Sequence, residues 1–117
     1  MNIKKLQKIA VAALEDIKAK DIEVLDTSKL SSMFDRIIIA TGDSNRHVKS
    51  LARSVHDKVK EAGGQIIGVE GEEAGEWVLV DLGDIVVHVM QPMVRAYYNL
   101  EELWKVAPKR ARKLAEG

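Results

Sequence analysis

The spacing of apolar residues changes several times along this chain, and each spacing predicts a different element. Between Leu6 and Ile17 apolar residues recur at steps of three and four, which predicts an amphipathic helix of about five turns. A second helix is predicted after Asp43-Ser44-Asn45, which offers several N-cap residues, and it stops at Gly63-Gly64. Its expected inward stripe is Val48, Leu51, Ala52, Val55, Val59 and Ala62.

Short apolar runs predict the strands. They lie at residues 21–26, 34–41 and 65–69 and on both sides of residues 81–84. The run at 34–41 is apolar on both faces in its second half, so we expect it in the centre of a sheet. Pro92 allows a third helix to begin, and Pro108 breaks it. The apolar side of this helix is expected to be Val94, Tyr97, Tyr98, Leu100, Leu103 and Trp104.

The predicted order is one helix, two strands, a second helix, three strands and a third helix, without repeats or a linker. The strand–helix–strand unit at residues 34–69 predicts one right-handed parallel crossover, and the hairpin formed by the last two strands adds antiparallel edges. We therefore expect a single α+β domain with a mixed β-sheet of about five strands and helices packed on it.

The hairpin between Glu76 and Met90 has two unusual faces. A two-residue loop would place Asp81 opposite Asp84, Leu79 opposite Val86 and Trp77 opposite His88. Side chains alternate along strands, so one face is purely aliphatic and must belong to the core. The other face carries Trp77, Leu79, His88 and Met90, with two carboxylates at its turn. Trp and Met are enriched where proteins contact one another, which favours a docking face.

Bulk properties exclude little. The chain has 117 residues, enough for one domain, and its 18 basic and 18 acidic residues balance. Six acidic and no basic residues lie between Glu70 and Asp84, which favours a basic partner or a solubilising loop. The chain has no cysteine, so a disulfide framework and thiolate metal sites are excluded, and a reducing cytosol fits. The apolar run near the start is interrupted by Glu15 and Asp16 and is too short to span a bilayer, so we expect a cytoplasmic protein with no membrane contact.

The segment from Thr41 to His47, between a strand and a helix, is the strongest candidate for chemistry. A helix N-terminus suits phosphate, but neither the phosphate-binding loop nor the dinucleotide fingerprint is present. The pair of metal-holding carboxylates that nucleotidyl transfer requires is also missing, so helix capping is the favoured interpretation. His47 and His56 are nine residues apart and do not converge, and the serines lie in no nucleophile motif. We expect no catalytic residue, metal, cofactor or small-molecule substrate.

Two basic segments leave an RNA-binding alternative open. Arg46, Lys49, Arg53, His56 and Lys60 fall on one outward stripe of the second helix, where they could contact RNA phosphates or simply be solvated. The cluster from Lys109 to Lys113 could add phosphate contacts, although a soluble tail is the simpler interpretation. Of the adjacent Tyr97 and Tyr98, one must face away from whatever the other packs against, so one is a candidate contact residue.

Several ordered motifs resemble the ribosomal silencing factor family, also called RsfS or iojap-like proteins. The resemblance extends from about Ile17 to Trp104 and predicts a domain at residues 1–104, followed by a basic tail at 105–117. The motifs are Thr41-Gly42-x-Ser44-x-Arg46-His47-Val48, Gly68-Val69-Glu70-Gly71, Trp77-Val78-x-Val80-Asp81-Leu82-Gly83-Asp84, Val87-His88-Val89-Met90 and Leu100-Glu101-x-Leu103-Trp104.

The resemblance implies a nucleotidyltransferase-like topology without its catalytic carboxylates, and a binding protein rather than an enzyme. It implies a translational repressor that binds the large ribosomal subunit at ribosomal protein fourteen, blocks joining with the small subunit under nutrient limitation, and forms a homodimer when free. A nucleotidyltransferase-type enzyme and an RNA-binding ribosome assembly factor are the alternatives. The expected partner-binding residues include apolar anchors, carboxylates that would face lysine or arginine on the partner, and a histidine that orients the face. They are Trp77, Asp81, Leu82, Gly83, Asp84, His88, Met90 and Tyr98.

Overall fold

Three helices and five strands follow one another along residues 1–100, the part of the chain that the computed structural model describes. Their order confirms the order predicted from the sequence, and the fold is the expected α+β domain with a mixed sheet. The elements are α1 (Ile3–Asp16), β1 (Lys20–Asp26), β2 (Arg36–Thr41), α2 (Asn45–Glu61), β3 (Gly68–Glu70), β4 (Trp77–Asp81), β5 (Ile85–Met90) and α3 (Pro92–Tyr98).

The strands form one sheet in the order β1-β2-β5-β4-β3. β5 runs parallel to β2, whereas the pairs β1–β2, β4–β5 and β3–β4 are antiparallel. The hairpin of β4 and β5 was expected at the edge, and that prediction is wrong, because the hairpin inserts between β2 and β3 and makes β5 the central strand. Every residue of β5 is buried, as a central strand requires.

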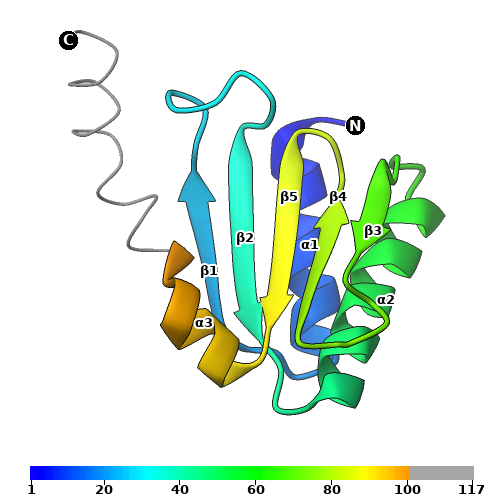
Figure 1. Ribbon diagram of the computed structural model, residues 1–117. Coiled ribbons are helices and arrows are strands. Elements are labelled where there is room, and N and C mark those ends of the chain that lie inside the picture. Colours follow the sequence, from blue (N-terminus) through cyan, green and yellow to red (C-terminus); the bar gives the residue numbers. More distant parts are fainter. Residues whose placement is uncertain (101–117) are drawn as a thin grey trace, which may run out of the picture.

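Two helices cover one face of the sheet. Figure 1 shows α1 and α2 side by side behind the strands, whereas α3 lies at one corner of the sheet. The core between the helices and the sheet includes the aliphatic face of the hairpin, as predicted. Its strand residues from β4 and β5 are all fully buried: Val78, Val80, Ile85, Val87 and Val89.

The register of the hairpin differs from the predicted one by two residues. Trp77 lies opposite Met90, not His88, and Leu79 lies opposite His88, not Val86. The Leu82 amide donates to the Ile85 carbonyl at 2.9 Å, so Gly83 and Asp84 occupy the centre of the turn. Gly83 has a φ of +91°, a backbone conformation that glycine adopts without a steric penalty. A slip of two residues keeps every side chain on its predicted face.

The ends of the helices correct the sequence prediction in three places. α1 has 14 residues, fewer than about five turns would need, and ends before Ile17. Ala62 lies beyond α2 and is exposed, so it does not belong to the inward stripe. α3 begins at Pro92 as predicted but ends at Tyr98, because Asn99 takes a left-handed conformation with a φ of +48°. The later residues expected on this helix, Leu103 and Trp104, and the basic tail at 105–117 lie outside the described residues.

Candidate docking site

The face of the hairpin turned away from α1 and α2 carries a coupled pair of side chains. The Trp77 Nε1–H donates to His88 Nδ1 at 3.0 Å, and the two ring centroids are 5.9 Å apart. The two residues are therefore neighbours, as expected, although they touch diagonally across the strands and not directly opposite. Because Nδ1 accepts this hydrogen bond, the neutral His88 ring carries its proton on Nε2.

His88 is held in its neutral form. Burial lowers the pKa of His88 from its ordinary value of 6.5 to about 4, because the charged ring would lose its hydration. A neutral ring can keep accepting the hydrogen bond from Trp77, whereas a protonated ring cannot. His88 therefore orients the indole and does not act as a charged contact near neutral pH.

Aromatic side chains from α3 extend this face outward. The Tyr98 ring lies 4.9 Å from the Trp77 ring, and the Tyr97 ring lies 5.0 Å from the Tyr98 ring. Tyr97 is 82% exposed and Tyr98 is 55% exposed, whereas Trp77 is half-buried. Met93 is exposed one helical turn before Tyr97 and so shares its side of α3. We call Trp77, Met93, Tyr97 and Tyr98 the α3 patch.

Two of the predicted apolar anchors do not reach the surface. Met90 is 0% exposed, because it ends the central strand between β2 and β4. Leu82 is 5% exposed and packs in the core on the helical side of the sheet. Neither side chain offers area to a partner, so neither belongs to the docking site.

The acidic residues lie at the other end of the hairpin. Asp81 is half-buried, and its Oδ1 accepts a hydrogen bond from the Gly83 amide at 2.8 Å. Asp84 is exposed, and its carbonyl accepts from the amides of Asp35 and Arg36. Trp77 and Asp81 are four residue steps apart along β4, a length of about 13 Å. Aromatic and acidic groups thus occupy opposite ends of the hairpin, within the diameter of one ordinary protein interface.

The junction between β2 and α2 is capped as the sequence predicts. Ser44 is the N-cap residue, and its hydroxyl accepts from the His47 amide at 3.1 Å. Gly42 permits a close approach, because a Cβ at this position would lie 2.8 Å from the Val48 side chain. Gln91, which directly follows β5, reaches the same region, where its side-chain amide donates to the side-chain oxygen of Asn45.

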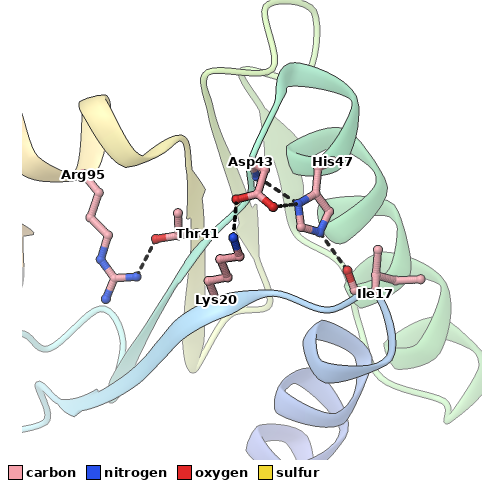
Figure 2. Close-up of polar contacts among 6 residues, drawn as sticks. All are labelled: Ile17, Lys20, Thr41, Asp43, His47 and Arg95. Atoms are coloured by element: carbon pink, nitrogen blue, oxygen red, sulfur yellow. Dashed lines mark hydrogen bonds and ion pairs between the residues drawn. The ribbon is translucent and has the colours of Figure 1, made fainter.

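Side chains at this junction are engaged with one another (Figure 2). The Asp43 amide donates to His47 Nδ1 at 2.9 Å, and His47 Nε2 lies 2.7 Å from the Ile17 carbonyl. Lys20 pairs with the Asp43 carboxylate at 3.0 Å. These contacts connect α2 to the end of α1 and the start of β1. The arrangement favours a structural brace over a phosphate site, since the groups a phosphate would use already have internal partners.

Arg95 is a residue of this region that the sequence analysis did not single out. Its guanidinium reaches the end of β2 from α3 and donates to the Thr41 hydroxyl at 2.8 Å (Figure 2). The signal in the sequence is one arginine close to two tyrosines. Its contact with Thr41 is visible only in the folded chain. Among residues 1–100, no three His, Asp or Glu side chains lie close enough together to hold a metal ion. No helix in that same range is long and apolar enough to cross a membrane.

The chain is similar to a family of known proteins. The family model described as ribosomal silencing factor during starvation matches residues 1–116. A ribosomal silencing factor from Chromobacterium violaceum is 65% identical over 104 residues, which are 89% of this chain and 85% of that protein. A crystal structure of a protein from Chromobacterium violaceum superposes with a TM-score of 0.88 at 65% identity, over 90% of this chain and 88% of that one. The mouse protein named mitochondrial assembly of ribosomal large subunit protein 1 is 31% identical over 80% of this chain and 42% of its own length.

Proposed function

Because the chain belongs to the ribosomal silencing factor family, we propose that it represses translation by binding the large ribosomal subunit and blocking its joining with the small one. The proposed contact is the α3 patch together with the acidic end of the hairpin. The partner is ribosomal protein fourteen on the large subunit, with nearby ribosomal RNA at its margin. No cofactor, metal or small-molecule substrate takes part.

One observation carries this proposal. No residue of α3 is fully buried among the described residues, and the helix exposes two tyrosines and a methionine beside a tryptophan. Aromatic and methionine side chains left exposed by the described residues are typical of the centre of protein interfaces. Tyr97 and Tyr98 would insert into the partner, with Trp77 supporting them from the sheet.

The acidic end of the hairpin supplies charge complementarity. Asp84 is exposed and Asp81 is half-buried, so both can face lysine or arginine on the partner. Such rim charges mainly raise the association rate and fix the orientation of the complex. Binding should therefore become slower at high salt, while the aromatic contacts set the dissociation rate.

The cellular setting follows from the family. Silencing under nutrient limitation would act in the cytoplasm, where ribosomal subunits join. We also propose that the free protein forms a homodimer. Equilibrium sedimentation of the purified chain measures this directly, and a single species at the mass of one 13.0 kDa chain would contradict it.

The most direct test is sedimentation with purified ribosomal subunits. We expect the protein to sediment with isolated large subunits, and added small subunits to join less when it is present. Protein that stays at the top of the gradient with large subunits would contradict binding. Binding without any change in subunit joining would contradict the proposed block.

An enzyme of the nucleotidyltransferase type is the first alternative. It requires bound nucleotide and metal at the sheet end near Thr41, where Asp43, Ser44 and His47 already have internal partners. Calorimetry with magnesium and ATP should therefore give no heat of binding. Saturable heat that Asp43→Asn abolishes would favour the enzyme.

An RNA-binding assembly factor is the second alternative. It would use the exposed basic stripe on α2, which includes Arg46, Lys49, Arg53 and Lys60. α2 lies behind the sheet in Figure 1, on the side away from the α3 patch. Charge reversal by Arg53→Glu should then weaken ribosome binding more than Asp84→Lys does, whereas the proposed function predicts the opposite ranking.

A further inference from the structure

We propose that Arg95 is a positioning residue for the docking surface: it fixes α3 on the end of the sheet so that Tyr98 stays packed on Trp77. The inference rests on the proposed function, because it concerns how the α3 patch is presented to the large subunit. Arg95 itself faces inward, with its side chain only 11% exposed. It therefore acts through the tyrosines and not through contact with the partner.

Among the contacts that hold the guanidinium of Arg95 are three groups on β1 and β2. Its Nη1 donates to the Thr41 hydroxyl of β2 at 2.8 Å and to the Asp21 carbonyl of β1 at 2.5 Å. Its Nη2 lies 3.8 Å from the Glu23 carboxylate, also on β1. A planar fork of donors can satisfy such separated acceptors together, whereas a lysine ammonium cannot.

An irregularity in β1 presents one of these acceptors. The pairing of β1 with β2 shifts register between Lys20 and Glu23, and Asp21 within the shift has a φ of +48°. This left-handed conformation is unfavourable for a residue with a side chain. Bulges of this kind re-aim backbone groups, and here the Asp21 carbonyl meets the guanidinium. The unfavourable backbone conformation of Asp21 thus occurs at the point where Arg95 attaches α3 to β1.

The rest of α3 has few other attachments. Gln91, just before the helix, donates its amide to the Glu76 carbonyl at 3.0 Å and its side chain to the Gly75 carbonyl at 3.2 Å. These bonds fix the start of α3, whereas Arg95 fixes it one turn later. No residue of α3 is fully buried among the described residues, and Val94 is only half-buried, so apolar packing contributes little to holding the helix there.

The position of Arg95 on the helix explains its effect on Tyr98. Residues three apart lie on neighbouring parts of a helix surface, so an inward Arg95 directs Tyr98 toward the sheet. There the Tyr98 ring meets Trp77, and Tyr97 in turn packs against Tyr98. Loss of the Arg95 contacts would remove the attachment of α3 to β1 and β2 one turn into the helix and would allow Tyr98 to move away from Trp77.

The proposal is tested with a double-mutant cycle on binding to isolated large subunits. Arg95→Met keeps the aliphatic stem and removes the donors, and we expect it to weaken binding about tenfold. Arg95→Lys should weaken it nearly as much. In a Tyr98→Ala background, Arg95→Met should add less than about twofold, because its effect passes through Tyr98. Two results would overturn the proposal. One is wild-type affinity of Arg95→Met, and the other is that Arg95→Met weakens binding by the same factor in the Tyr98→Ala background as in the wild type.

Two further variants keep the test decisive. Lys4→Met, at an exposed lysine on α1, is the control for removal of a surface cation and should bind as the wild type does. Thr41→Val removes one acceptor at nearly constant shape and should weaken binding about threefold, which covers the case that Arg95→Met fails to fold.

Hydrogen exchange on the free protein separates this inference from the proposed function. Arg95→Met should speed exchange of the α3 amides and leave the α2 amides unchanged. If the wild type does not bind large subunits but α3 exchange responds, the proposed function fails and the positioning role stands. If the wild type binds and Arg95→Met changes neither binding nor α3 exchange, the positioning role fails and the proposed function stands.

Discussion

The junction between β2 and α2 and the α3 patch lie at the same end of the sheet but use their side chains in opposite ways. At the junction, Ser44, Asp43 and His47 are engaged with the backbone or with charged neighbours. In the α3 patch, Tyr97 and Tyr98 contact other rings but leave most or half of their surface exposed. The side chains of the junction make internal contacts that stabilise the fold. Those of the α3 patch remain exposed and can contact a partner.

This difference shows why residue type alone is a poor guide to a site. The junction has the composition of a phosphate site, with a glycine, a serine and a histidine at a helix N-terminus. Its groups nevertheless brace α1, β1 and α2 together. The α3 patch has the composition of a small core, yet the helix that carries it buries none of its side chains among the described residues. Availability of the groups, not their chemistry, separates the two regions.

The largest expected effect contrasts two methionines three residues apart. Met90→Ala should lower the free energy of unfolding by about 2–5 kcal/mol, because it leaves a cavity in the central strand's surroundings. Met93→Ala, at an exposed position of α3, is the matched control and should change stability little. Denaturant titration measures both. Equal stability of the two variants would contradict the burial of Met90.

Acid should weaken the support beneath the α3 patch. The pKa of His88 is lowered to about 4 by burial, whereas the unfolded chain takes up the proton near 6.5. The contribution of neutral His88 to the free energy of unfolding is therefore fully present above pH 6.5. It is lost as the pH decreases toward 4, by on the order of 3 kcal/mol in total. The measurement is the free energy of unfolding against pH for the wild type and His88→Phe. Parallel curves for the two proteins between pH 6.5 and 4 would show that His88 is not the cause.

Removal of the indole should be the largest change in partner affinity. We expect Trp77→Ala to cost about 2 kcal/mol or more, which is about thirtyfold in affinity for the large subunit, because Tyr98 loses its support. Met33→Ala, at an exposed methionine in the loop before β2, is the control for general loss of apolar surface. Unchanged binding by a folded Trp77→Ala protein would remove this residue from the interface.

The smallest effect is expected at the junction and should concern stability alone. Ser44→Ala removes the N-cap hydroxyl of α2 and should cost about 1 kcal/mol of unfolding free energy. Ribosome binding should stay at the wild-type level at a temperature where the variant is folded. Ser50→Ala, at an exposed position within α2, is the control. A loss of binding without a loss of stability would give the junction a role in docking and break the contrast between the two regions.

Much of the fold could be predicted because the signals are local. The inward stripe of α2 from Val48 to Val59, the Ser44 cap and the proline start of α3 each depend on a few neighbouring residues. The place of the hairpin in the sheet could not be predicted in this way. The alternation of side chains shows that one face of the hairpin belongs to the core, but not that β2 and β3 lie on either side of the hairpin. Sheet order depends on contacts between residues far apart in the sequence.

The candidate site was predicted in part for the same reason. Trp77 and His88 were expected to touch and do so, and Tyr98 was expected near them. Met90 shares the face of Trp77, but its burial depends on strands that the hairpin pattern does not include. Arg95 was missed because its acceptors at Asp21 and Thr41 come from two other strands.

The hairpin shows which properties of a side chain the sequence determines and which depend on the tertiary structure. By itself, the sequence determined which side chains share a face, because strand side chains alternate with a period of two and a register slip of two residues leaves that alternation unchanged. Tertiary structure alone decided that Trp77 lies opposite Met90, that Met90 is buried and that α3 is fixed by Arg95. The physical reason is that the face of a side chain is set by its own strand, whereas its exposure is set by everything packed around that strand.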